Sequence, residues 1–596
     1  MKKRLLSMLL SLCTLFTFTA CTTTQQPAVP ESTGQKTTDQ AAEAQVSDIT
    51  VYKNGVIYTS NPSQDYVDTL VVQDGKFLYA GDEAGAAQYM QDLPSENIVD
   101  LDGRLVTPGF IEGHTHFSFM AAMKSLGYIE IPSEANDSPE TALAELKKFV
   151  EEHPDYDQYA IGNFSQQFDI NKDMLDEICA DKPVICIGMG LHCGYVNTEF
   201  LKRGNITKDS VDAIPGQTYY ERDAEGNPTG KIVELPQTWI AFSQAIKIDN
   251  EKLQKAYLEM IDLYHSFGFT GVAEGGFLGL DDYQMLDNLK ALEDKGDLNM
   301  VICPANIWYG HTITPLEEIE NRLITCKETY TTDLIKPGTL KMWADGTLGA
   351  HSALLREPYD DKDTCGVYLN TVEDLTDAAL MCKENDMNIH YHAIGDKAIE
   401  NALTALEAVG ETTGSKSIVH FQISASDLIE RASKIDDLIV NITPTWANVF
   451  VSEEIDPIGD RRNIFGLYKE VKDAGITVNF GADSNGEETA WNPVLMILAS
   501  MLRNPDEETL LLKGEPFSFE EAVDAYTINV AKERRIDNEY GSIEVGKSAD
   551  FVIWNLDTVA EALEAIATET DLEPTNTEFV YADKVYFKGD KIYQHE

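Results

Sequence analysis

Basic residues are scarce in this sequence. Its 596 residues include 100 aspartates and glutamates against 46 lysines and arginines, which gives a formal net charge of −54 at pH 7. A nucleic acid has to be held by a positively charged surface, and this composition does not supply one. The sequence therefore argues against nucleic-acid binding and leaves small molecules as the expected partners.

Paired cysteines are missing as well. Seven cysteines follow residue 21, an odd number, and they are widely scattered. A disulfide framework would show an even set, and a structural zinc site would show Cys-x-x-Cys pairs. We interpret Cys179, Cys186 and Cys193, which recur every seven residues, as buried thiols; the other four are Cys303, Cys326, Cys365 and Cys382.

Two common catalytic signatures are also absent. The sequence contains no phosphate-binding loop that ends in Gly-Lys-Ser/Thr, because "AEGGFLG" lacks that ending. It contains no Gly-x-Ser-x-Gly elbow of the kind that presents the nucleophile in serine hydrolases. Catalysis through either device is thereby excluded.

The one strongly apolar segment near the start reads as an export signal. "MKKRLLSMLLSLCTLFTFTAC" has a basic start, an apolar run and small residues before Cys21. The end resembles the lipobox of bacterial lipoproteins, although Phe18 stands where an aliphatic residue is preferred. We predict a signal peptide over 1–21, a lipid anchor on Cys21 outside the cytoplasm, and a flexible tether over 22–47. Plain secretion or an uncleaved anchor is the alternative.

The two ends of the remaining chain share one pattern. Short β-rich runs alternate with Asn-Gly, Asp-Gly and Gly-Asp turns in residues 48–107, and a similar pattern returns in 540–596. We predict a small β-sandwich-like domain formed from both ends. Between them, in 108–539, helical windows alternate with short apolar runs, which is typical of βα units around a parallel sheet. The predicted fold is α/β, a (β/α)8 TIM barrel of about 250 residues with insertions.

Polar side chains stand where several of these predicted barrel strands end. In a barrel, the loops after the strands build the active site. The candidates are His114 and His116 in "GFIEGHTH", Lys341 in "GTLKMWADG", His392 in "MNIHYHAIGD", His420 in "SIVHFQ" and Asp483 in "ITVNFGADS".

The spacing of these candidates agrees with a barrel. At about 31 residues per βα unit, the 28 residues from His392 to His420 span one unit, and the 63 from there to Asp483 span two. His116 and Lys341 are 225 residues apart, far more than three units. We therefore predict an insertion domain after the first barrel strand, near 125–245.

The order of these motifs resembles the amidohydrolase superfamily, in particular amidohydrolase family 3. The likeness covers nearly all of the chain beyond the tether and includes "TPGFIEGHTH", "GLHCGYVNT", "KMWADGTLGAHSALLREPY", "HYHAIGDKAIENALTALE" and "GSIEVGKSADFVIW". The resemblance implies a metal-dependent hydrolase. It also implies that His392 and His420 are metal ligands, and that Asp483 takes a proton from a metal-activated water and returns it to the leaving nitrogen.

Residue chemistry supports a metal site of this kind. Residues i and i+2 of a strand point to one side, so His114 and His116 project together, and imidazole suits zinc and related ions. Lys341 stands where two-metal members carry a lysine that reacts with CO2 to give a bridging carbamate. An ion pair of Lys341 with Asp345 is the alternative. His390 would share the side of His392, but the family likeness favours His392.

The sequence also predicts pocket residues and a reaction. The resemblance places His192, Asn197, Asp345 and His351 at the substrate pocket, with an ordinary loop role as the alternative for Asn197 and His351. One or two divalent ions, expected to be zinc, would activate water against a non-peptide amide, an N-acyl amine or an N-formyl amine. Deamination and ester or lactone hydrolysis would use the same residues, and a lipoprotein that only captures solutes is a further alternative. A homo-oligomer is compatible with the sequence.

Overall fold

The computed structural model of the protein describes residues 49–188, 191–446, 456–483, 492–501, 517–556 and 580–595. The predicted signal peptide, Cys21 and the tether over 22–47 lie outside the described residues. Within those ranges, no helix is both long and apolar enough to cross a membrane.

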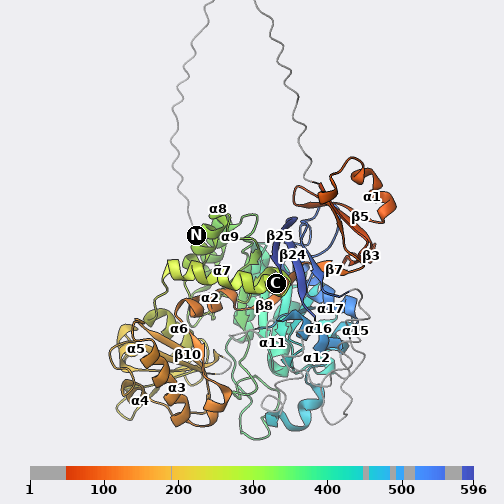
Figure 1. The fold of residues 1–596 in the computed structure, drawn as a ribbon. Helices are drawn as coiled ribbons and strands as arrows, with labels where there is room; N and C mark the ends of the chain where they lie inside the picture. The colour runs from red at the N-terminus through yellow and green to blue at the C-terminus, as the bar shows by residue number, and fades with distance from the viewer. Residues whose placement is uncertain are drawn as a thin grey trace, which may run out of the picture. The chain divides into compact units, whose positions relative to one another are not determined.

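Strands from both ends of the chain share one sheet. Its order is β25-β24-β23-β7-β2-β3, so β23, from near the C-terminus, pairs antiparallel with β7, from near the N-terminus. The red and blue strands of this sheet lie together in Figure 1. Phe551 stacks on Tyr586 with ring centroids 4.4 Å apart, which ties the late strands into one apolar core. The strands are β2 (Val56–Tyr58), β3 (Tyr66–Val67), β7 (Leu105–Pro108), β23 (Phe551–Trp554), β24 (Ala582–Phe587) and β25 (Asp590–Gln594).

A second sheet at this end of the molecule uses the early chain alone. Its order is β5-β4-β1-β6. Hydrophobic residues of β1 and β4 face α1 (Glu83–Met90), which begins at Asp82, where the side chain accepts from the Gly85 amide. The strands are β1 (Ile49–Lys53), β4 (Thr69–Gln73), β5 (Lys76–Gly81) and β6 (Ile98–Asp100).

Residues 129–233 build a separate mixed sheet with its own apolar core. The order is β13-β14-β12-β11-β10-β9, and α3, α4 and α5 accompany it in the orange and yellow part of Figure 1. α3 starts from a capping box at Ser138, followed by Pro139, so the sequence dictates where the helix begins. The elements are β9 (Ile129–Glu130), α3 (Pro139–Glu152), β10 (Tyr159–Phe164), α4 (Lys172–Asp176), β11 (Val184–Gly188), β12 (Cys193–Val196), α5 (Thr198–Arg203), β13 (Tyr219–Arg222) and β14 (Pro228–Val233).

The middle of the chain alternates helices with parallel strands. One sheet has the order β16-β15-β8, and another runs β17-β18-β19-β20-β21-β22, with every neighbouring pair parallel. All of these strands are almost wholly buried, as expected for parallel strands covered by helices. They are β8 (Phe110–Thr115), β15 (Phe269–Glu274), β16 (Val301–Cys303), β17 (Ala305–Ile307), β18 (Thr339–Trp343), β19 (Asn388–Ala393), β20 (Lys416–His420), β21 (Leu438–Ile442) and β22 (Thr477–Phe480).

The helices between these strands follow capping rules. α8 begins after Asp281, whose side chain accepts from the Gln284 amide, and ends at Gly296 in a left-handed conformation with φ of 77°. The helices of this region are α2 (Phe117–Ser125), α6 (Gln237–Ala245), α7 (Asn250–Ser266), α8 (Asp282–Lys295), α9 (Leu316–Tyr330), α10 (Val372–Glu384), α11 (Asp396–Val409), α12 (Ser426–Ala432), α15 (Tyr468–Asp473), α16 (Pro493–Met501), α17 (Phe519–Ala525) and α18 (Ile528–Arg534).

A chain connection and a hydrogen bond link the two parallel sheets. β16 and β17 follow each other in the chain with only Pro304 between them, so residues 301–307 serve both sheets. At the other end, the Asp483 amide just after β22 donates to the His114 carbonyl of β8 over 2.7 Å. The fold is mixed α/β, and closure of these strands into a complete barrel stays a prediction.

All seven cysteines after residue 21 have free thiols, and every one except the partly exposed Cys365 is buried. The interpretation of Cys179, Cys186 and Cys193 as buried thiols is confirmed.

Candidate metal centre

The His114–His116 pair stands at the end of the buried strand β8. His116 is the residue from which α2 starts. Glycines let the neighbouring strand come close, since a Cβ on Gly113 would lie 2.3 Å from the Phe480 carbonyl oxygen, and one on Gly481 would lie 2.5 Å from the His114 Cβ. Both glycines are thus needed for β22 to reach the histidines.

Asp483 lies among three imidazoles. Its Oδ1 is 3.5 Å from Nε2 of His114 and 3.5 Å from Nε2 of His116, and its Oδ2 is 3.6 Å from Nε2 of His420. These separations exceed ordinary hydrogen bonds. They match the spacing of about 3.3 Å between two ligand atoms that share one tetrahedral ion at about 2.0–2.1 Å. The spacing around Asp483 is therefore of the kind that ligands of a first-row divalent ion show.

His114, His420 and Asp483 each place one ligand atom within 4.8 Å of the other two. Lys341 adds a fourth group, because its Nζ lies 3.4 Å from Nε2 of His114. Its side chain is fully buried on β18. Nitrogen and oxygen donors of this mixture suit zinc and its neighbours in the periodic table.

Burial sets the charge states in the cluster. It lowers the pKa of His116 to about 3, and lowers the pKa of His114 and His420 well below the usual value. It also lowers the pKa of Lys341 to about 7, although Asp483 opposes the shift. Neutral imidazole is the form that binds metal, so the burial of these side chains prepares them as ligands.

His392 is placed differently from the other predicted ligands. Its ring lies 4.5 Å from that of His420, but its Nε2 is 3.3 Å from the Gly346 carbonyl oxygen and 3.6 Å from Asp345 Oδ1. Asp345 is completely buried and accepts from the backbone amides of Leu354, Ile394 and Gly395. In this arrangement Asp345 organises the loop after β18 and does not pair with Lys341.

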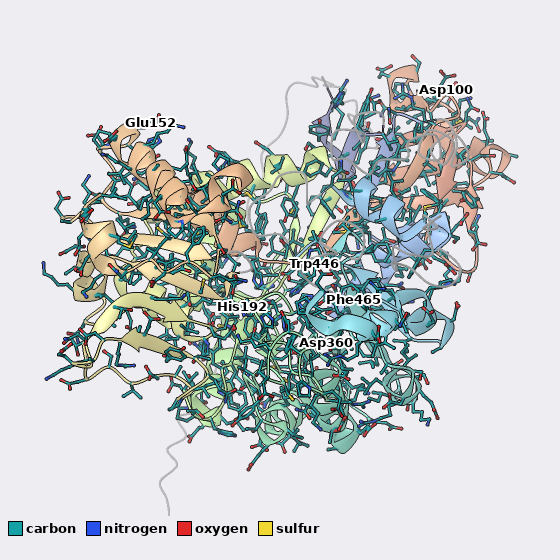
Figure 2. The ribbon with its side chains drawn as sticks, turned by 90° about the horizontal axis from the view of Figure 1, so that it is seen from below. Asp100, Glu152, His192, Asp360, Trp446 and Phe465 are labelled. Carbon is teal, nitrogen blue, oxygen red and sulfur yellow. The ribbon has the colours of Figure 1, made fainter. Side chains whose placement is uncertain are left out.

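His192 reaches the site from the separate sheet. It lies between β11 and β12, is 5% exposed, and its Nδ1 contacts Oε1 of Glu234, which follows β14. Burial alone would lower the pKa of His192, but Glu234 and the more distant Asp345 and Asp483 outweigh it and raise the pKa. Figure 2 shows His192 toward the middle of the molecule, whereas Glu152 of the same segment lies at the outer edge.

Two predicted pocket residues have their polar atoms engaged elsewhere. Asn197 is completely buried at the start of α5, accepts from the amides of Phe200 and Val184, and donates to the carbonyls of Cys179 and Lys182. These contacts are structural and lie within the separate sheet.

His351 uses Nε2 to contact the exposed carboxylate of Asp361 at 2.9 Å. Its ring also lies edge-on to Tyr359, with centroids 4.9 Å apart. The polar atom that could have met a substrate is thus bound to a surface residue.

The sequence placed His390 on the side of His392 without giving it a role, and it gave no role to Glu234 or Glu533. His390 lies two register positions before His392 on β19, since it pairs with Lys341 while His392 pairs with Trp343. Its position two residues before His392 was a signal that both face inward. Glu234 and Glu533 are far from their histidine partners in sequence, so no local pattern could have identified them.

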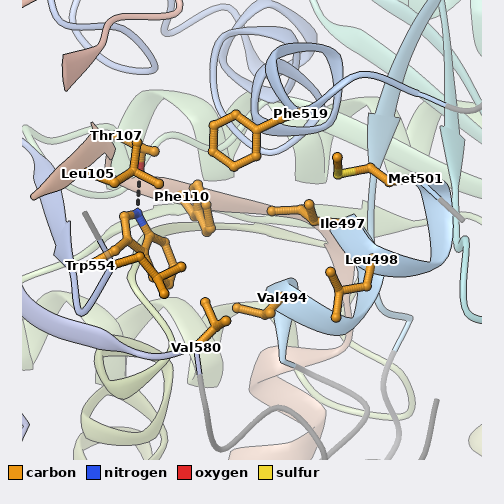
Figure 3. Close-up of a pocket in the computed structure, with 11 residues that line it drawn as sticks. Leu105, Thr107, Phe110, Val494, Ile497, Leu498, Met501, Phe519, Trp554 and Val580 are labelled. Carbon is orange, nitrogen blue, oxygen red and sulfur yellow. Dashed lines mark hydrogen bonds between the residues drawn. The ribbon is translucent and has the colours of Figure 1, made fainter. Parts of the chain in front are cut away.

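An apolar cavity lies elsewhere in the molecule. Its lining comes from β7, the start of β8, β23, α16 and α17 and includes Leu105, Phe110, Ile497 and Phe519. Figure 3 shows that Trp554 at its wall donates through Nε1 to the Thr107 hydroxyl, at 3.0 Å. None of the clustered histidines lines this cavity, so it has no part in the metal centre.

The chain is similar in sequence and in fold to several known proteins. The sequence profile described as "Amidohydrolase family" matches residues 97–593. The "Exoenzymes regulatory protein AepA" of Pectobacterium carotovorum subsp. carotovorum is 27% identical over 424 residues, covering 68% of this chain and 87% of that protein. The "N-substituted formamide deformylase" of Arthrobacter pascens is 21% identical over 533 residues, covering 85% and 93%. An uncharacterized metal-dependent hydrolase from Pyrococcus furiosus has a TM-score of 0.65 at 23% identity, covering 86% of this chain and 99% of that structure.

Proposed function

We propose that this chain, which belongs to the amidohydrolase family, hydrolyses a carbon–nitrogen bond in a small non-peptide amide. N-acyl and N-formyl amines are the substrate class. The observation that carries the proposal is the position of Asp483, with its two carboxylate oxygens 3.5–3.6 Å from three buried imidazoles. The name of the Arthrobacter pascens relative, a formamide deformylase, supports the choice of bond.

The proposal includes a closed (β/α)8 barrel. Eight parallel strand positions follow one another from β8 through β15, the joined β16 and β17, and β18 to β22. The hydrogen bond from the Asp483 amide to the His114 carbonyl supports closure between the last strand and the first. A closed ring would bring the carboxyl ends of all the strands to one mouth, where such enzymes have their active sites.

The family implies a divalent metal, and we propose zinc. His114, His116, His420 and Asp483 would hold it, and His392, whose ring lies 4.5 Å from that of His420, is the remaining candidate ligand. When bound, the ion supplies Lewis acidity and makes water a stronger acid. Imidazole with carboxylate is a donor set that zinc accepts readily.

Carbamate formation on Lys341 would decide whether the site holds one ion or two. Its buried amine, with a pKa lowered to about 7, is partly neutral at physiological pH. A neutral amine attacks CO2 through its nitrogen lone pair, forms an N–C bond and releases one proton, which leaves a carbamate with two oxygens. The carbamate would supply oxygen donors for a second ion, and the Lys341 Nζ lies 3.4 Å from Nε2 of His114.

Asp483 would move the proton. It takes a proton from the attacking water as the water oxygen adds to the amide carbonyl, and it returns the proton to the nitrogen as the C–N bond breaks. Burial raises the pKa of Asp483 to about 6, against the opposing effect of Lys341. A carboxyl group titrating near neutral pH can accept and return a proton within one cycle.

His192 would contribute a hydrogen-bond donor to the substrate. Its Nδ1 is bound to Glu234, which leaves Nε2 as the ring nitrogen available to a substrate oxygen. Hydrogen-bond donors placed where negative charge develops lower the barrier of acyl transfer. Asp345 and His351 would shape the loop at the mouth.

Export and anchoring complete the proposal. We propose that the mature protein is held outside the cytoplasm by a lipid on Cys21 and acts there on small molecules, with a homo-oligomer compatible with this placement. A Cys21→Ser chain expressed with its signal should move from the membrane fraction to the soluble exported fraction. Wild-type protein found only in the soluble fraction would overturn the anchor.

The function is tested by screening the purified protein with added Zn2+ and bicarbonate against N-acyl amines, N-formyl amines, esters, lactones and aminated rings. Turnover limited to the first two groups supports the proposal. Turnover of esters or rings alone assigns the site to another bond, and tight solute binding without turnover or metal favours capture. An His116→Ala protein that retains full metal content and full activity would refute the metal site.

A further inference from the structure

A buried hydrogen-bond chain runs beneath His114 and away from the metal centre. His390 Nε2 lies 3.0 Å from His114 Nδ1, and His390 Nδ1 lies 2.8 Å from Glu533 Oε1. Asn479 donates to the other oxygen of Glu533, and Ser417 Oγ is 2.6 Å from His390 Nδ1. His390 is completely buried and Glu533 is 1% exposed.

The positions of the protons in this chain can be deduced. Burial alone would raise the pKa of Glu533, but Arg534, His390 and Asn479 outweigh it and lower the pKa to about 2. An ionised carboxylate can only accept, so His390 Nδ1 carries a proton and donates it. Since Nδ1 of the His390 imidazole donates to Glu533, the lone pair of the ring lies on Nε2, which accepts from His114.

The same reasoning reaches His114. Because His390 Nε2 accepts, His114 Nδ1 must carry the proton that is donated. The lone pair of His114 then lies on Nε2, the atom that faces Asp483 and Lys341 at 3.5 and 3.4 Å. A metal ligand with the wrong ring nitrogen protonated could not coordinate through Nε2.

The three histidines near Asp483 differ in this respect. His116 Nδ1 contacts the Gly276 carbonyl oxygen at 3.2 Å, a backbone acceptor that no side-chain substitution removes. His420 Nδ1 has no hydrogen-bond partner among the described residues. His114 alone of the three is held through a second side chain that ends on a carboxylate.

We infer that His390 and Glu533 are positioning residues that fix the tautomer and orientation of His114 for metal binding. This inference rests on the proposed metal site. A carboxylate behind a ligand imidazole also makes the ligand nitrogen more basic. The two residues touch neither substrate nor metal, and they act through His114.

The test is a double-mutant cycle on Zn2+ affinity, measured by competition with a chromogenic chelator. Glu533→Gln, His390→Phe and the double variant are compared with wild type, with melting of each apo protein recorded alongside. Loss of such a partner costs about 10- to 100-fold in metal affinity. Because both act through one path, the double variant should bind no more weakly than His390→Phe alone.

His265→Gln is the matched control, since this buried imidazole of α7 has an Nε2 without a partner among the described residues. It should leave Zn2+ affinity within twofold of wild type even if the apo protein melts earlier. The absorption spectrum of the Co2+-loaded protein gives a second readout. Glu533→Gln should shift its visible bands, and His265→Gln should not.

The outcomes separate the two claims. Wild-type affinity and an unshifted cobalt spectrum in Glu533→Gln would overturn the positioning role alone. Affinity losses that add fully in the double variant would also overturn it, since two independent effects would then be present. If His390→Phe fails to fold, Glu533→Gln and the cobalt spectrum still decide. Wild-type protein that binds no Zn2+ would overturn the proposed function, and the positioning role with it.

Discussion

The backbone amide of Asp483 donates a 2.7 Å hydrogen bond to the carbonyl of His114. These residues are 369 positions apart in sequence, between the ends of β22 and β8. The bond fixes the carboxylate next to the ring that it faces, so a single backbone contact sets the distance between the proposed proton carrier and a proposed metal ligand. Side-chain chemistry at this site therefore depends on strand pairing.

Asp483→Asn should reduce kcat by about 10²- to 10⁴-fold at saturating Zn2+, because an amide cannot accept the proton from water. The backbone should not change, since asparagine tolerates the φ of 44° found at this position. Steady-state kinetics on the best substrate of the screen measures the loss. Asp361→Asn, at an exposed carboxylate, is the control, and a variant at position 483 with kcat within tenfold of wild type would contradict the assignment.

Variants of Lys341 should show whether the site holds one ion or two. Lys341→Met should bind one ion fewer than wild type, whereas Lys341→Glu should keep the wild-type number, because glutamate supplies a carboxylate without CO2. Bicarbonate should stimulate the wild type and have no effect on Lys341→Glu. Metal analysis after gel filtration gives the stoichiometry. Equal metal content in wild type and Lys341→Met would show that no carbamate bridges two ions.

His192→Gln should lower kcat/KM by about 10²-fold and leave the Zn2+ content unchanged, as expected for a donor that acts on the substrate. Glu234→Gln should have a similar effect, since it removes the partner of the His192 Nδ1. His351→Gln is the matched control, because its Nε2 is bound to Asp361. If His192→Gln and Glu234→Gln both kept activity close to wild type, His192 would have no part in the site.

Asn197→Ala should destabilise the protein by roughly 2 kcal/mol, since it removes a helix cap and leaves buried backbone groups without partners. Its kcat and KM should stay near wild type below the melting temperature. Thermal unfolding and kinetics at 25 °C together measure this separation. A large rise in KM without a change in melting would instead return Asn197 to the substrate pocket.

Asp550 should make stability depend on pH. Burial raises the pKa of this carboxyl from its usual 3.8 to about 6, so the folded protein holds the proton more tightly than the unfolded chain. Its contribution is fully present below about pH 4 and is lost as the pH rises through about 6, an effect of about 3 kcal/mol for two pKa units.

Asp550→Asn removes this titration but keeps an oxygen for the Lys588 amide and the Ser548 hydroxyl, each 2.7 Å away. The free energy of unfolding of wild type minus variant should therefore fall as the pH rises from 4 to 6. Urea denaturation at several pH values measures it. A difference that is constant with pH would contradict the raised pKa.

Much of the molecule follows from local sequence rules. Ser138-Pro139 starts α3 and Gly296 ends α8 because caps and left-handed positions restrict which residues can stand there. Alternating βα patterns predicted parallel strands, and a histidine or acid after several of them predicted a cluster. These signals depend on residues that are close together in sequence, so they can be recognised without knowing the fold.

Partners far apart in sequence depended on the tertiary structure. Glu533 lies 143 residues from His390, and Glu234 lies 42 residues from His192, with no pattern that links either pair. The register of β18 on β19 placed His390 beside Lys341 and sent His392 toward Asp345. The sequence by itself determined which chemical groups were available and roughly which strand ends carried them. Packing decided which ring nitrogen of His114 and His116 faces the proposed metal site, because only the folded chain brings His390 and the Gly276 carbonyl to the other nitrogen.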